Sequence, residues 1–163
     1  MTVFNHSWEK FMNFRTVVAS MLLLVAGTAF AGDDGVIRVK SAYPMAETIA
    51  RLKGDVAAKG IRFFDEIDQA KLAADAGIKV LPSTLLVFGN PPLGTQFLNA
   101  RQQAGLDWPV RLLVQQDERG EVWAVYTDFG WIARRHDITG EAAKPFLTAT
   151  GVIASITSSI LAK

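Results

Sequence analysis

The sequence predicts a single α+β domain in which helices cover one face of a largely antiparallel sheet, in the order β-α-β4-α with short inserted helices. Three observations predict this fold class. Short β-branched stretches alternate with amphipathic helical patterns, the last two strand patterns are joined by a tight turn, and no internal repeat or linker divides the chain. Residues 32–163 are therefore assigned to one domain.

The first strand is expected at Val36 to Ser41, where β-branched residues dominate. A helix is expected from Pro44 to Lys59, because apolar residues recur there at helical spacing. Glu47 and Arg51 stand four residues apart and are predicted to pair. Gly60 supplies the C-terminal stop.

The middle of the chain predicts two further strands, at Ile61 to Ile67 and at Ser83 to Phe88. An Ala-rich helix is expected between them, at Gln69 to Ala76. The second of these strands is apolar throughout, which is typical of a strand inside a sheet rather than at its edge. A short helix at 93–103 is expected to follow.

The last third predicts a hairpin and a closing helix. The hairpin strands are Val110 to Gln115 and Val122 to Thr127, joined by a polar turn that contains Gly120. Apolar residues from Phe146 to Ile160 follow the i+3/i+4 rule, so this helix is expected to pack one stripe on the sheet. Pro145 is expected in its first turn or at a kink.

Residues 1–31 match a secretory signal peptide. Thr16 to Ala31 carries no charge, has a Leu-rich centre, and ends in an A-x-A arrangement at Ala29 and Ala31. The apolar run is about 16 residues long, against about 20 for a transmembrane helix, which favours cleavage over an anchor. The expected destination is the periplasm or the extracellular space. Met12 opens a compact signal sequence, and either Met1 or Met12 is the translation start.

Charge and composition exclude several function classes. Loss of Glu9, Lys10 and Arg15 with the signal peptide takes the formal net charge from +1 to zero. No long basic run remains, so nucleic-acid binding is not expected. The chain has no cysteine, which excludes disulfides and a lipid-modified cysteine anchor.

Only His136 remains as a histidine in the mature chain, so no transition-metal site and no cofactor are expected. His136 lies between two arginines and Asp137. We interpret it as part of a solvated polar turn before the last helix, and a catalytic base is the alternative.

Three carboxylates cluster in the sequence RFFDEIDQA, and paired carboxylates can divide acid and base roles. Strand alternation predicts that Asp65 projects with Phe63 and that Glu66 projects to the other face. Asp68 immediately precedes the Ala-rich helix and is expected to be its N-cap. An acid/base role for Asp65 or Glu66 is the alternative to a solvated edge.

The sequence FGNPPLGT, residues 88–95, has two interpretations. As a structural corner, Gly89 would supply a positive φ, Asn90 would cap the next helix, and Pro92 would stand in its first turn. As the wall of a small-molecule pocket, the same corner would act together with Gly94 and Thr95. The two prolines remove backbone donors and disfavour a phosphate site.

The same element also resembles a known family. FGNP-x-x-G-T, and L-x-x-P-x-R-x-L-V at the hairpin entry, are similar to motifs of the domain of unknown function 302 family. The resemblance runs from about Val36 to Ile138 and into the last helix. It implies a TATA-binding-protein-like α+β fold and no assigned reaction. Relatives often carry His where this sequence has Gln69, which Gln cannot fully replace.

Two functions remain open. The preferred one is an exported, noncatalytic domain that binds a small molecule or a protein partner, with a homodimer as one such partner. The alternative is a cofactor-free hydrolase or isomerase that uses carboxylates with Arg111 and Arg134, and it requires that these side chains converge in one concavity. The candidate binding residues are Asn90, Gly94, Thr95, Asp65, Arg111, Trp123 and Trp131.

Overall fold

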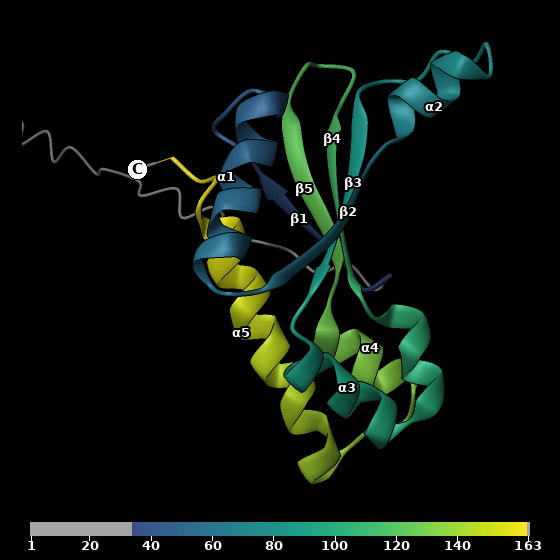
Figure 1. Cartoon of the computed structure of the whole chain (residues 1–163), viewed down its shortest axis with the longest axis vertical. Coiled ribbons are helices and arrows are strands. Elements are labelled where there is room, and N and C mark those ends of the chain that lie inside the picture. Colours follow the sequence, from purple (N-terminus) through teal and green to yellow (C-terminus); the bar gives the residue numbers. More distant parts are fainter. Residues whose placement is uncertain (1–33, 163) are drawn as a thin grey trace, which may run out of the picture.

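The computed structural model describes residues 34–162, so the predicted signal peptide and its cleavage site lie outside the described residues. This part of the chain forms one five-stranded sheet with helices, as Figure 1 shows. The elements are β1 (Val36–Lys40), α1 (Met45–Ala58), β2 (Arg62–Asp68), α2 (Gln69–Asp75), β3 (Ser83–Gly89), α3 (Pro91–Ala100), the 3-10 helix η1 (Gln102–Asp107), β4 (Val110–Gln116), β5 (Val122–Thr127), α4 (Phe129–Arg135), the 3-10 helix η2 (Gly140–Ala143) and α5 (Lys144–Ser158).

The sheet has the strand order β1-β5-β4-β3-β2, and every neighbouring pair is antiparallel. The expected fold class is therefore confirmed. The apolar strand β3 lies inside the sheet, between β4 and β2, and the predicted β4–β5 hairpin is present. β1 and β2 are the two edge strands.

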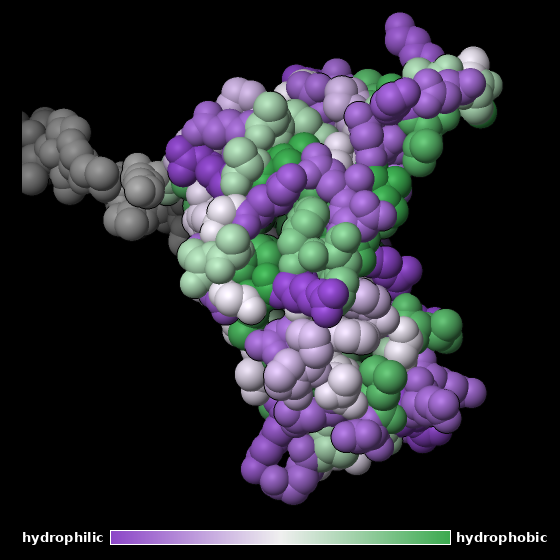
Figure 2. Space-filling view, viewed as in Figure 1, coloured by the Kyte–Doolittle hydropathy of each residue, from purple (hydrophilic) through white to green (hydrophobic). Residues whose placement is uncertain are grey.

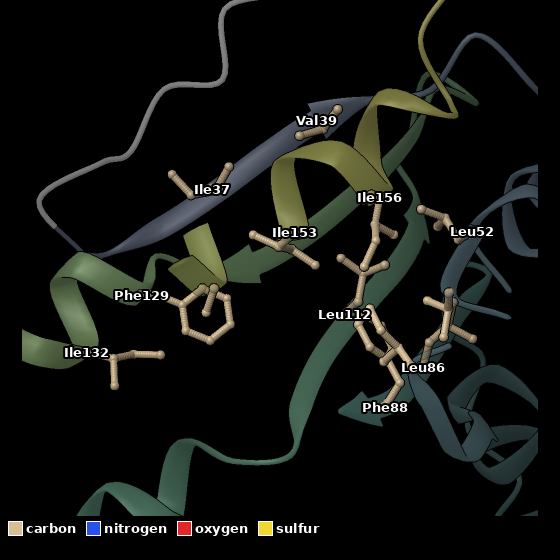
Figure 3. Packing of buried hydrophobic residues seen from close by; sticks show 14 of the residues in the cluster. Ile37, Val39, Leu52, Leu86, Phe88, Leu112, Phe129, Ile132, Ile153 and Ile156 are labelled. Carbon is tan, nitrogen blue, oxygen red and sulfur yellow. The ribbon is translucent and has the colours of Figure 1, made fainter. Parts of the chain in front are cut away.

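The core lies between one face of the sheet and the helices α1 and α5 (Figure 3). Leu52 of α1 and Ile153 and Ile156 of α5 point toward Leu86 of β3 and Leu112 of β4, and all five side chains are almost completely buried. Each such side chain contributes about 1.5 to 3 kcal/mol through removal from water. This face of the sheet therefore fixes the positions of α1 and α5.

The two ends of the sheet differ. Helices α3 and α4 gather at one end beside α5, whereas α2 projects from the other end (Figure 1). α3 contacts η1 and α5, and α4 packs on α5. None of the helices between residues 34 and 162 is both long enough and apolar enough to cross a membrane.

Several local features match their sequence signals. Arg51 pairs with Glu47 at 2.7 Å, and the side chain of Asp68 accepts a hydrogen bond from the backbone N–H of Lys71 at 2.9 Å, as an N-cap does. Pro145 stands in the first turn of α5. These interactions are local in sequence, which is why the sequence predicts them.

Two elements differ from the sequence prediction. The helix expected at 93–103 begins earlier, at Pro91, because Asn90 is its N-cap, and it gives way to a 3-10 helix. α4 was not predicted. Its N-cap is Asp128, whose carboxylate accepts a hydrogen bond from the backbone N–H of Trp131 at 2.6 Å.

A β-bulge in β2 corrects the predicted facing of the carboxylates. Phe63 pairs with Phe88, but Asp65 pairs with Val87, so the register shifts between them. Asp65 and Phe63 therefore project to opposite faces, not to the same face as strict alternation predicts. Glu66 projects toward α1 and pairs with Lys53.

Candidate functional site

The corner between β3 and α3 is built as the structural interpretation predicts, apart from its glycine. The side chain of Asn90 caps α3 and accepts a hydrogen bond from the backbone N–H of Leu93 at 3.4 Å. Pro91 and Pro92 occupy the first helical positions, where a missing N–H costs nothing. Gly89, however, does not have a positive φ, so the expected reason for that glycine is wrong.

The two glycines of the corner make room for Trp108. A Cβ on Gly94 would lie 1.8 Å from the indole Nε1 of Trp108, and a Cβ on Gly89 would lie 3.0 Å from the same atom. Both glycines are buried. Steric access for the indole therefore explains why glycine is present at both positions.

Beneath this corner lies a cavity of about 40 Å3. One water molecule needs about 10 to 15 Å3, so the cavity as built admits a group of only a few heavy atoms, and a larger ligand requires its walls to move apart. The stacked rings of Phe97 and Phe146, 4.0 Å apart, lie in the same part of the core. The cavity walls are Ile61, Phe88, Gly89, Asn90, Leu93, Gly94, Phe97, Trp108, Val110, Phe129, Ala149, Val152, Ile153 and Ile156.

The walls are apolar, with two polar exceptions near the corner. The indole Nε1 of Trp108 is a hydrogen-bond donor. Asn90 is exposed, and because its cap uses the side-chain oxygen, its amide NH2 is left to donate elsewhere. The cavity therefore suits a mostly apolar molecule that carries a hydrogen-bond acceptor.

The cavity includes two of the predicted binding residues, Asn90 and Gly94, but not Thr95. Thr95 is exposed, and its hydroxyl donates to the backbone carbonyl of Pro91 at 2.8 Å. The helix itself uses this hydroxyl. Trp108 is not among the candidate binding residues, because its contact with Gly94 spans 14 positions and has no local sequence pattern.

The other predicted residues lie elsewhere. Asp65 is on the β2 edge, and its carboxylate accepts a hydrogen bond from the backbone N–H of Glu66. Trp123 donates its indole N–H to Asp117 at 3.1 Å. The ring of Trp131 packs against Gly35, with the Arg135 guanidinium 5.6 Å from its centroid.

A second, polar hollow of about 20 Å3 lies next to the cavity, and Val110 and Phe129 line both spaces. Arg111, Tyr126 and Thr127 also border it. Burial raises the pKa of the Tyr126 phenol, so this group is a neutral hydrogen-bonding partner at neutral pH.

Asp107 lies at the base of this hollow and binds three cationic or basic side chains. His136 Nε2 is 2.7 Å from its carboxylate, Arg135 Nη1 is 3.1 Å away, and Arg111 Nη2 is 3.8 Å away. Asp107 and His136 are both about 7% exposed. The predicted solvated turn at His136 is therefore wrong, because its imidazole is buried on a carboxylate that lies 29 positions away in the sequence.

The residues required for the enzymatic alternative do not converge. Arg111 borders the polar hollow, whereas Asp65 and Glu66 are on the β2 edge and Arg134 lies 4.0 Å from Asp128. Within residues 34–162, no group of three or more metal-ligating side chains could hold a metal ion. Gln69 accepts a hydrogen bond from the Ser83 hydroxyl at 2.7 Å.

Comparison with known proteins places this architecture in a family. The family described as "Domain of unknown function DUF302" matches residues 37–156. This chain belongs to the DUF302 family. A solved DUF302 structure, an uncharacterized conserved protein from Bacillus stearothermophilus, superposes with a TM-score of 0.71, covers 78% of this chain and 98% of its own, and is 17% identical. The DUF302 fold is therefore shared.

Curated relatives of this DUF302 chain carry a different name. Proteins named "Fluoride-specific ion channel FluC 1", from Brucella suis biovar 1 and Brucella abortus biovar 1, are each 35% identical over 124 residues. The match covers 74% of this chain but 49% and 46% of those proteins. The chain thus spans about half the length of the curated relatives it matches.

Proposed function

We propose that this protein is an exported, noncatalytic domain that binds a small, mostly apolar molecule in the cavity beneath the β3–α3 corner. The observation that carries the proposal is the apolar cavity of about 40 Å3, which the packing of Trp108 against Gly89 and Gly94 helps to shape. Natural cores leave few voids of this kind, because each void forgoes dispersion contacts.

The polar groups at the corner narrow the ligand class. Nearly all of the wall is apolar, so an ionic ligand would lose its hydration without compensation. The Asn90 amide and the Trp108 indole N–H are donors, so they favour a ligand with a carbonyl, ether or hydroxyl oxygen at one end. The proposed ligand is therefore a small apolar molecule with one acceptor oxygen.

The polar hollow supports catalysis less well. A general base must reach the reacting proton, directly or through one water. His136 is not among the residues that border the hollow, and its Nε2 is already bound to Asp107. Arg135 pairs with the buried Asp107 carboxylate, and His136 Nε2 lies 2.7 Å from it. This cluster is better explained as a structural contact between η1 and α4.

Native mass spectrometry of protein purified from its own host tests the binding proposal. We expect a retained small molecule that organic solvent extracts. Val152 lines the cavity, so Val152→Trp should fill it and abolish retention. Leu147→Trp is the matched control on the same helix, because Leu147 is 65% exposed. Ligand-free wild-type protein, or equal retention in a folded Val152→Trp variant, would contradict the proposal.

The export part of the proposal depends on the signal sequence. Thr16 to Ala31 has the apolar core and the A-x-A site that signal peptidases recognise. We expect a chain that begins near Gly32 in the envelope or medium fraction. Mapping the N-terminal peptide from fractionated cells tests this, and full-length protein in the cytoplasm would contradict it.

The relatives named as fluoride channels indicate that a matching region occurs within longer proteins, and we propose no channel activity for this chain on that basis. Residues 34–162 build their own hydrophobic core, so we propose that the matching region in those longer proteins is a separately folded domain. In this chain we expect fluoride and chloride salts to have the same effect on Trp108 fluorescence. A saturable change with fluoride alone would instead favour a fluoride-linked role.

A further inference from the structure

At the end of the sheet opposite the cavity, residues 69–82 form an arm that consists of α2 and the loop leading to β3. None of these residues is buried. The arm nevertheless carries four exposed large apolar side chains: Leu72 at 59%, Ile78 at 59%, Val80 at 48% and Leu81 at 49%. Figure 2 shows the arm projecting from the body, with hydrophobic side chains among its charged ones.

Such an arm is poorly explained in an isolated chain. α2 has seven residues and no buried side chain, and helices this short owe their stability to packing rather than to intrinsic propensity. Surface loops are normally polar, whereas Ile78, Val80 and Leu81 all lie on this one. Clustered exposed apolar residues of this kind mark an interaction surface.

A groove lies directly beside the arm. It encloses about 580 Å3, including open solvent, between Leu81 and Pro82 at the base of the arm and the β4–β5 hairpin. Gln115 and Gln116 line the hairpin side, and their amides can bond to the backbone of an inserted loop. The projecting element and the hollow that could receive it thus lie next to each other on the same molecule.

The charges of the arm and the groove are complementary. Lys79 lies among the apolar residues of the arm, and Glu118 borders the groove. Among the described residues, neither side chain forms an ion pair. A Lys79 that enters the groove of another copy would find Glu118 there.

We propose that the arm and the groove form a reciprocal interface between two copies of this chain. Because both features adjoin Leu81, a two-fold axis close to this residue places each arm in the groove of the other copy, which is an isologous contact. The apolar side chains supply the buried area, and two equivalent Lys79–Glu118 pairs fix the register.

A lipid surface is the competing occupant, since exposed apolar residues beside lysines also suit membranes. The hairpin next to the arm carries Asp117, Glu118 and Glu121 against one cation, Arg119, so its net negative charge would be repelled by anionic headgroups. The charge distribution therefore favours a second copy of the chain.

Sedimentation equilibrium of protein purified from its host tests the interface. We expect a dimer whose dissociation constant rises on the order of 30-fold in Ile78→Asp, because a charge replaces an apolar side chain of the arm that the interface buries. Leu147→Asp, at an exposed leucine away from the arm, is the control and should leave the dimer unchanged. Monomeric wild-type protein, or an unchanged dimer in Ile78→Asp, would overturn the proposal.

A charge swap tests the register. Lys79→Glu and Glu118→Lys should each weaken the dimer about fivefold, and the double variant should restore it, because the pair is re-formed with reversed signs. A double variant weaker than both single variants overturns the assigned pairing. Co-sedimentation of wild-type protein, but not of Ile78→Asp, with phosphatidylglycerol vesicles would overturn the second copy in favour of a membrane.

Discussion

The apolar cavity and the polar hollow share Val110 and Phe129 as walls, yet they are built in opposite ways. In the cavity, two glycines admit Trp108, and space remains beside it. In the hollow, the buried Asp107 carboxylate already binds His136 and Arg135. The difference indicates that the apolar cavity, and not the polar hollow, is free to take a ligand, because the chain itself already pairs the charged groups of the hollow.

This comparison also separates two kinds of stability. The polar cluster depends on the buried Asp107 carboxylate, and its removal leaves the buried His136 imidazole without its partner. The cavity depends on shape, where the largest penalty comes from adding atoms rather than removing charge. Substitutions in the two regions should therefore have different sizes and different effects on ligand retention.

The largest expected effect is on the polar side. Asp107→Ala should lower the free energy of unfolding by about 3 to 5 kcal/mol, because His136 stays buried without its partner. Chemical denaturation measures it. The same substitution at Asp75, whose pair with Lys71 is exposed, should cost under about 1 kcal/mol. Equal losses at the two positions would show that burial does not set the energy of the Asp107 cluster.

On the cavity side, Gly94→Ala should cost about 1 to 3 kcal/mol and displace Trp108, because the new Cβ would lie 1.8 Å from its Nε1. Thermal melts and Trp fluorescence report the two changes. Gly151→Ala is the matched substitution in a helix, since a Cβ on Gly151 meets nothing within 4 Å. It should stabilise the protein by up to about 1 kcal/mol. The diagnostic result is a loss of stability in Gly94→Ala together with a gain of stability in Gly151→Ala.

Asn90→Ala should have a smaller effect on stability, about 1 kcal/mol, through loss of the α3 cap. It should also weaken ligand retention, because the side-chain amide at the cavity mouth is lost. Asn99→Ala, on the exposed side of the same helix, controls for the residue type. Denaturation and native mass spectrometry together separate the two roles, and a purely capping Asn90 would change stability alone.

Thr95→Val should have the smallest effect, below about 0.5 kcal/mol, because its exposed hydroxyl bonds only to its own helix. Ligand retention should not change. A clear loss of ligand in this variant would place Thr95 in the binding site and shift the site to the outer surface of α3.

The sequence predicts the fold well because its signals are local. The Asn90 and Asp68 caps, the Glu47–Arg51 pair and the β4–β5 turn each involve neighbours within about one helical turn or one hairpin. These features determine where the elements begin and end.

The candidate site is predicted only in part, because its key contacts are distant in sequence. Nothing near Gly94 indicates that an indole from residue 108 would occupy the place of its side chain. Likewise, the sequence around His136 shows arginines and an aspartate, while its actual partner is Asp107. No sequence pattern predicts the bulge in β2 either, although this bulge places Asp65 and Phe63 on opposite faces of the sheet.

The central claim is that the cavity is a binding site, and the indole N–H signal of Trp108 reports on it most directly. Titration of 15N-labelled protein with cyclopentanone, a small apolar molecule with one acceptor oxygen, should give a saturable shift of the Trp108 indole signal in two-dimensional NMR, because its Nε1 lies beside Gly94 at the cavity wall. The indole signals of Trp123 and Trp131, which lie outside the cavity, should stay in place. No shift at Trp108, or equal non-saturating shifts at all three indoles, would contradict the account.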